Sequence, residues 1–129
     1  MGIKIPSIHN LLEDEERVRK VFKESGSVRK ALRSAKYLTT HEVLRICAEE
    51  KLKILGYNIV NRSDAPRWIK DVGSPDIIAE KDGKFVLVEV KPSGQFKRYS
   101  ATKAKFIIVT NVEEGGKVDI WGIRELEEI

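Results

Sequence analysis

The pair Asp82-Gly83 is the feature that most constrains how this 129-residue chain can fold. It stands between the apolar run 77–79 and the β-branched run 85–90. Asp-Gly in such a position is a strong signal for a tight β-hairpin. We therefore predict two antiparallel strands here, with position 76 opposite roughly position 90.

Three helices are predicted upstream of this hairpin. Residues 11–23 carry apolar positions at helical spacing, and the acidic cluster 13–16 suits a helix N-terminus electrostatically. Ser27 can cap a second, short helix. The segment Thr-Thr-His-Glu at 39–42 matches a capping box, and the helix that follows it should end at Gly56.

Further strand signals surround the hairpin. Residues 57–62 are strand-like, a short helix is expected over about 95–103, and a last strand over 118–121. The apolar run 106–110 has the character of a central parallel strand that is buried on both faces. This order of elements predicts an α/β fold with a mixed β-sheet flanked by helices.

Composition excludes several classes of protein. The single cysteine, Cys47, cannot form an internal disulfide, and only His9 and His41 could join it as zinc ligands, so a metal must be held by oxygen atoms. No apolar run approaches the length of a membrane span, and residues 1–6 lack the apolar stretch of a secretion signal. We therefore expect a soluble, cytoplasmic protein without a membrane partner.

Charge is segregated along the chain, whose formal net charge is +4. Residues 1–38 form a basic helical extension of the core 39–129, and within it the segment 17–36 has eight cations and one acid. Residues 91–105 have five cations and no acid, whereas residues 113–129 have six acids and two cations. This pattern predicts a basic face for a phosphate backbone, and solvated helices with a charged terminus are the equal alternative.

Three chemically active side chains converge on the hairpin. Glu89 and Lys91 share one face of their strand, and the turn brings Asp76 close to them. Two adjacent carboxylates repel unless a cation lies between them, and hard oxygen ligands suit Mg²⁺ or Mn²⁺. Lys91 could then position or deprotonate an attacking water. The alternative is an ordinary surface salt bridge on a strand.

Pro75-Asp76, followed after a hairpin by Glu89-Val90-Lys91, resembles the PD-(D/E)XK nuclease superfamily over roughly residues 42–121. The resemblance implies a restriction-endonuclease-like fold for the core. It also implies that Asp76 and Glu89 are metal ligands together with the Val90 carbonyl, and that Lys91 is the catalytic lysine. The family includes restriction endonucleases, archaeal Holliday-junction resolvases and RecB-type exonucleases.

One family position departs from the pattern. The family places a glutamate about eleven residues before the glycine that ends the preceding helix, and Arg45 occupies that position here. Glu42 and Glu49 lie one turn to either side, and we rank Glu42 first as the completing catalytic residue. Glu42 has a competing role as the capping partner of Thr39, and Glu49 a competing role as a solvated helix charge.

The remaining candidates are nucleic-acid contacts. Gln95 and Tyr99 are similar to a motif of RecB-type nucleases, although local packing of this pair is the favoured alternative. Trp68 lies in a predicted loop and packs over the sheet or stacks on a base. The expected contacts are Arg29, Lys30, Arg33, Arg67, Lys70, Gln95, Lys97, Arg98, Tyr99 and Lys103.

The N-terminal segment looks like the opening helices of a helix-turn-helix unit, with the third helix in the recognition position. We prefer two basic helices that clamp the substrate backbone or mediate dimerisation. The sequence thus predicts a Mg²⁺-dependent nuclease of the endonuclease or junction-resolvase type, acting on DNA as a homodimer. The alternative is a non-catalytic DNA-binding protein or regulator on the same scaffold.

Overall fold

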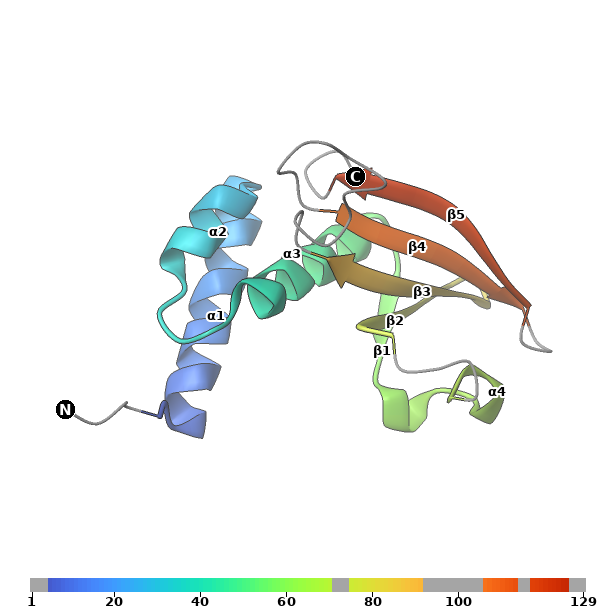
Figure 1. Cartoon of the computed structure of the whole chain (residues 1–129), viewed down its shortest axis with the longest axis horizontal. Helices are drawn as coiled ribbons and strands as arrows, with labels where there is room; N and C mark the ends of the chain where they lie inside the picture. Colours follow the sequence, from blue (N-terminus) through green and yellow to red (C-terminus); the bar gives the residue numbers. More distant parts are fainter. Residues whose placement is uncertain (1–4, 71–74, 92–105, 114–116, 126–129) are drawn as a thin grey trace.

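The computed structural model describes residues 5–70, 75–91, 106–113 and 117–125, and the side chains up to Val90. Three helices come first and an antiparallel sheet follows, with the long third helix between the other two helices and the sheet (Figure 1). No helix within these ranges combines the length and apolar composition that crossing a lipid bilayer requires.

Helix α1 spans Ile8–Ser25. The Ser7 side chain accepts a hydrogen bond from the Asn10 amide at 3.1 Å, and Gly26 ends the helix with φ 66° in the left-handed region. This cap starts the helix one turn earlier than predicted. The acidic cluster 13–16 therefore lies beyond the first turn, and its assignment to the helix N-terminus is wrong.

Both predicted downstream caps are confirmed. Ser27 accepts a hydrogen bond from the Lys30 amide at the start of α2, Val28–Ser34. Thr39 accepts one from the Glu42 amide at 3.2 Å at the start of α3, Thr40–Ile54. These bonds satisfy amides that lack partners within the first helical turn, so the local sequence determines where each helix begins.

The strands are β1 (Asn58–Val60), β2 (Ile77–Lys81), β3 (Lys84–Lys91), β4 (Phe106–Glu113) and β5 (Lys117–Glu125), and they lie side by side in chain order. The predicted hairpin between β2 and β3 is confirmed. Asp82 and Gly83 both have positive φ, at 52° and 77°. A two-residue turn needs these values for its twist to match that of the two strands it joins.

The prediction of a parallel strand and a mixed sheet is wrong. Strand β4 pairs antiparallel with both β3 and β5, and the pairs β1–β2 and β2–β3 are antiparallel too. An apolar run reports burial on both faces, but it contains no information on strand direction. Helices with an antiparallel sheet are therefore the architecture of the described residues.

Side chains of β3 alternate between two apolar clusters. Val86, Val88 and Val90 belong to the larger cluster, which also contains buried residues of all three helices. Leu87 belongs to a smaller cluster on the other face, with Ile69 of the one-turn helix α4, Arg67–Lys70. This alternation follows from the period of two along a strand and directs Glu89 away from the larger cluster.

Helix α4 occupies a segment that was predicted to be a loop, because a single helical turn leaves no recognisable period in the sequence. It is preceded by the 3-10 turn η1, Arg62–Asp64. The ring of Trp68 lies edge-to-face on Phe85 with centroids 5.6 Å apart. Trp68 therefore packs over the sheet, which was one of the two roles expected for it.

Helix α3 is about half buried. Seven of its fifteen residues are buried, because α1 and α2 cover one side of it and the sheet covers another (Figure 1). A helix that enters a major groove must expose a polar face to the bases. The buried positions of α3 pack on the other helices and the sheet, and the helix-turn-helix interpretation stays a prediction.

Candidate functional site

Asp76 stands directly before β2, and its Oδ2 accepts a hydrogen bond from the Val90 amide of β3 at 2.8 Å. The register pairs Ile77 with Val88, so continuing it by one residue sets Asp76 opposite Glu89. The prediction of position 90 was off by one, because the turn contains only two residues. The carboxylate of Asp76, one residue before β2, thus faces the position of Glu89 on β3.

Glu89 and Lys91 share one face of β3, since the buried Val88 and Val90 alternate with them. Glu89 is half-buried, and in the register it pairs with Ile108. The side chain of Lys91 lies outside the described residues. The strand pairing therefore brings the positions of Asp76, Glu89 and Lys91 together at one end of the sheet, on its central strands.

His41 also lies at this end of the sheet, and the sequence did not predict its position beside Asp76. Its Nε2 lies 3.3 Å from Asp76 Oδ2, and it is the second residue of α3. The Thr39 cap sets where α3 starts, and the helix start places His41 beside the beginning of β2. A separation of 35 residues leaves no local signal for this contact.

The two candidate glutamates of α3 have different surroundings. Glu49 forms ion pairs with Arg45 at 2.6 Å and with Arg19 of α1 at 3.2 Å. These contacts commit the Glu49 carboxylate to the helix interface and disfavour it as a metal ligand. Glu42 is half-buried next to His41, and its amide completes the Thr39 cap.

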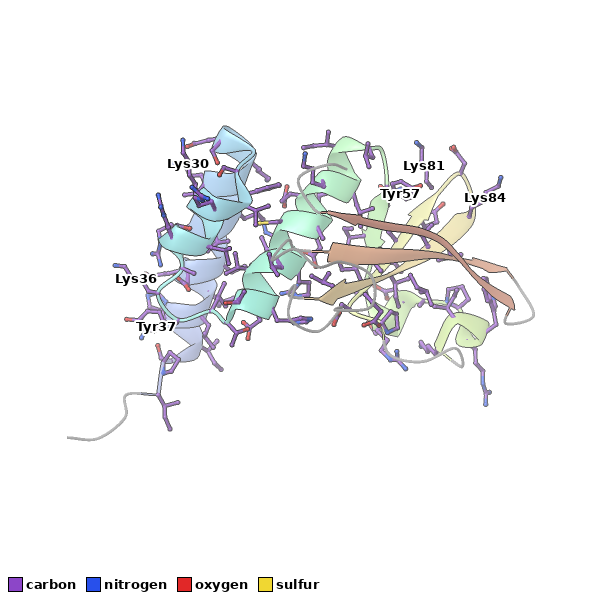
Figure 2. The ribbon with its side chains drawn as sticks, turned by 45° about the horizontal axis from the view of Figure 1, so that its top comes forward. Lys30, Lys36, Tyr37, Tyr57, Lys81 and Lys84 are labelled. Atoms are coloured by element: carbon purple, nitrogen blue, oxygen red, sulfur yellow. The ribbon has the colours of Figure 1, made fainter. Side chains whose placement is uncertain are left out.

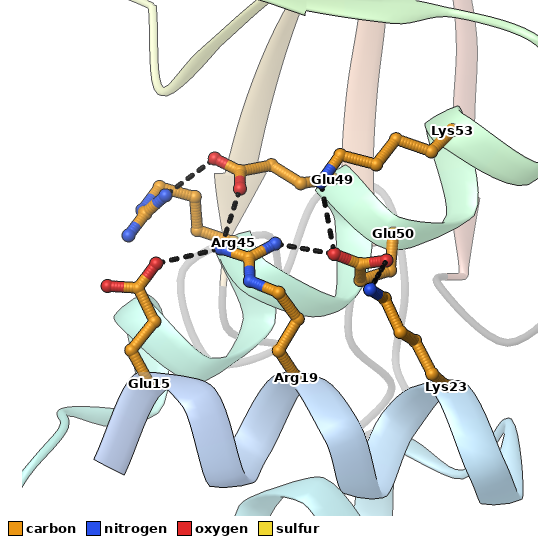
Figure 3. Close-up of polar contacts among 7 residues, drawn as sticks. All are labelled: Glu15, Arg19, Lys23, Arg45, Glu49, Glu50 and Lys53. Atoms are coloured by element: carbon orange, nitrogen blue, oxygen red, sulfur yellow. Dashed lines mark hydrogen bonds and ion pairs between the residues drawn. The ribbon is translucent and has the colours of Figure 1, made fainter. Parts of the chain in front are cut away.

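A wider network surrounds Arg19 between α1 and α3 (Figure 3). Arg19 donates to Glu50 at 2.6 Å and to Glu15 at 2.8 Å, and Lys23 and Lys53 also pair with Glu50. Burial acts to lower the pKa of Arg19, but the carboxylates of Glu50, Glu15 and Glu49 raise it above its ordinary value. Burial likewise raises the pKa of Glu50, and the bonds from Arg19 and Lys53 more than reverse this. Arg19 and Glu50 are therefore both charged at neutral pH, and their pairing joins α1 to α3.

Asp14 is a second fully buried carboxylate, and it is saturated with donors. The amides of Lys36, Tyr37 and Leu38 donate to it at 2.9–3.1 Å, and Arg17 also donates to it. Burial acts to raise the pKa of Asp14, but the amides of Lys36, Leu38 and Tyr37, with Arg17, lower it below its ordinary value. This contact attaches the segment before α3 to α1.

Asp76 and Glu89 are the residues at this end of the sheet that could hold a hydrated magnesium ion. Within the described ranges, no group of three or more His, Cys, Asp or Glu side chains is placed to hold a metal. Mg²⁺ usually takes only one or two carboxylates and keeps several waters, so the facing carboxylate positions of Asp76 and Glu89 fit this ion.

The predicted nucleic-acid contacts fall in three places. Arg29, Lys30 and Arg33 are exposed on α2. Arg67 and Lys70 are exposed on α4, where the Lys70 ammonium donates to the Ser63 carbonyl at 3.3 Å. The remaining predicted contacts lie outside the described residues, namely Gln95, Lys97, Arg98, Tyr99 and Lys103.

The chain matches no model of a known protein family, and neither curated proteins nor solved structures yield a similar protein.

Proposed function

We propose that this protein is a Mg²⁺-dependent nuclease that hydrolyses DNA phosphodiester bonds. The observation that carries the proposal is the bond between the Val90 amide and Asp76, because it brings Asp76 beside the strand of Glu89 and Lys91. Two acids and a lysine at one end of a sheet can hold a hard metal ion and place a cation beside a phosphate, which suits phosphodiester hydrolysis. The resemblance to PD-(D/E)XK nucleases in these same residues is a second support.

Each side chain has a role in this proposal. Asp76 and Glu89 bind Mg²⁺ with the Val90 carbonyl, and the ion supplies Lewis-acid stabilisation of the phosphate charge. Lys91 positions or deprotonates the attacking water, or stabilises the developing charge. Glu42 lies at the start of α3 and completes the catalytic set. His41 fixes the orientation of Asp76 through their contact.

The proposed substrate is a DNA duplex or junction, cut by a symmetric homodimer, since cleavage of two strands needs two sites. Exposed cations on α2 and α4 supply phosphate contacts. Sedimentation of the full chain with and without a four-way junction measures the stoichiometry, for which we expect two chains per junction.

A second candidate function is non-catalytic DNA binding on the same scaffold. The observation that favours it is the Arg45–Glu49 pair at 2.6 Å. The residue at the family's glutamate position is thus a cation, and it neutralises one of the two acids that could replace that glutamate.

A cleavage assay separates the two functions. Wild-type protein with Mg²⁺ should cut at least one of a duplex, a single strand and a four-way junction, and EDTA should abolish the cutting. Asp76→Asn should reduce the rate at least about 100-fold, because it removes a charged ligand. Asp82→Asn is the matched control: it makes the same change at the exposed turn, where asparagine tolerates the positive φ. Cutting by Asp76→Asn at the wild-type rate contradicts the assigned site.

A further inference from the structure

The cations of the helical part of the chain fall into two groups. Arg17, which also bonds the Ser34 carbonyl of α2, and Arg19 and Arg45 at the α1–α3 interface each pair with a carboxylate. Five others are exposed, and none forms an ion pair with any residue that the structure describes: Lys20 on α1, and Arg29, Lys30, Arg33 and Lys36 on α2 and directly after it. The charge of this second group is available to a partner.

The positions of the three cations on α2 do not favour folding. Arg29 and Lys30 lie in the first turn of α2, which contains no acid, although the N-terminus of a helix favours negative charge. Arg29 and Arg33 are also four residues apart, where like charges repel across one helical turn. A local conflict of this kind, without a stabilising contact in return, is typical of a functional surface.

An aromatic ring continues the same surface. Tyr37 is 47% exposed and follows Lys36 directly. The amides of both residues donate to the buried carboxylate of Asp14, so the backbone that carries the ring is fixed. Figure 2 shows Lys30, Lys36 and Tyr37 on one side of the helical part, at the opposite end of the molecule from Lys81 and Lys84.

We propose that this surface, formed by Arg29, Lys30, Arg33, Lys36 and Tyr37, binds a single-stranded segment of nucleic acid. The cations contact successive phosphates, and the Tyr37 ring stacks on an unpaired base. A duplex satisfies the cations but not the ring, because its base faces are already covered by neighbouring bases. An exposed ring on a fixed backbone beside unpaired cations therefore favours a single strand.

This surface is close in the chain to the end of the sheet that carries Asp76. Tyr37 is four residues from His41, a span of at most about 14 Å along the chain. His41 in turn contacts Asp76 at 3.3 Å. Resting on the proposed nuclease function, the inference adds a substrate class, namely DNA with an unpaired segment next to the bond that is cut.

Binding is measured by fluorescence anisotropy with the full chain in EDTA, which separates binding from cleavage. The probes are a labelled 20-nucleotide oligo-dT and a duplex of equal length, each at several salt concentrations. Tyr37→Leu should weaken binding of the single strand about 5- to 100-fold and leave duplex binding within about twofold. Tyr37→Phe, which keeps the ring, should bind as the wild type does, and Tyr37→Gln serves if the leucine variant fails to fold.

The cations are tested separately. The double variant Lys30→Gln, Lys36→Gln should make the slope of log K against log salt shallower by about 0.7 per lost contact on the single strand. The control is Lys81→Gln, Lys84→Gln, which removes two exposed cations at the other end of the molecule and should leave the slope unchanged.

Three results would overturn the inference: unchanged single-strand affinity in Tyr37→Leu, equal losses on both probes, or an equal loss in the Lys81, Lys84 control. These results can be told apart from results that contradict the proposed nuclease function. Absence of Mg²⁺-dependent cleavage by a protein that binds as described rejects the proposed function alone. Cleavage without any preference for the single strand rejects the inference alone.

Discussion

Asp14 and Asp76 both join elements that are distant in sequence, but their surroundings differ. Asp14 is fully buried between α1 and the segment before α3, and three amides and Arg17 donate to it. Asp76 keeps 22% of its side-chain surface exposed, and both of its contacts with the described residues involve Oδ2. A carboxylate with every acceptor position filled can only support the fold, whereas Asp76 keeps acceptor capacity that a metal ion could use.

The largest expected effect is on the saturated carboxylate. Asp14→Ala should lower the free energy of unfolding by about 3–5 kcal/mol, because it leaves three amides and Arg17 without their acceptor in a buried position. Urea denaturation followed by circular dichroism measures this change. Glu16→Ala, an exposed acid on the same helix, is the control and should stay within about 0.5 kcal/mol. A loss below 1 kcal/mol for Asp14→Ala would mean that water replaces the carboxylate and that the segment is not attached through it.

The Arg19 network should show the next largest effect. Glu50 is 4% exposed and accepts from Arg19, so Glu50→Ala should cost about 2 kcal/mol by leaving a partly buried guanidinium with fewer partners. The cost is smaller than for Asp14 because Glu15 and Glu49 still contact Arg19. Glu15→Ala, at the more exposed end of the same network, should cost about 0.5 kcal/mol. Equal losses in the two variants would show that the stability cost of losing a contact in this network does not depend on how buried it is.

The loss of folding stability at low pH should arise from the same two carboxylates, Asp14 and Glu50. The folded pKa of Asp14 and of Glu50 lies below the ordinary values of 3.8 and 4.5, so the unfolded chain binds more protons. Their contribution to stability is complete above these ordinary values and is lost as the pH falls through the folded pKa. We expect the free energy of unfolding to fall below about pH 4.5, with a slope of up to about 1.4 kcal/mol per pH unit for each group.

Urea titrations between pH 7 and pH 2.5 measure this slope. Asp14→Asn should flatten it, since the amide does not titrate. The same slope in the variant and in the wild type would assign the acid sensitivity to other carboxylates.

Local features of the sequence predicted local features of the structure. The caps at Ser27 and Thr39 and the turn at Asp82-Gly83 depend on residues within one turn of each other, so their side chains and allowed φ values determine them. The Arg45–Glu49 pair likewise joins two residues that are four apart on one helix.

Features that depend on distant residues could not be predicted in this way. The partners of Asp14 lie 22 to 24 residues away and are backbone amides, which every sequence supplies. His41 contacts Asp76 across 35 residues. The direction of β4 depends on the path of the chain before it, which apolar periodicity does not encode.

The smallest effect on stability is expected at Asp76, and it is the sharpest test of the comparison. The carboxamide oxygen of Asp76→Asn can still accept the Val90 amide, so the free energy of unfolding should change by less than about 1 kcal/mol. Asp14→Asn must instead turn an NH₂ group toward donors, and it should lose at least about 2 kcal/mol. Both variants and the control Asp82→Asn are compared by urea denaturation in EDTA, so that no metal contributes. An equal loss in the two asparagine variants would make Asp76 a structural residue like Asp14 and remove the observation on which the nuclease proposal rests.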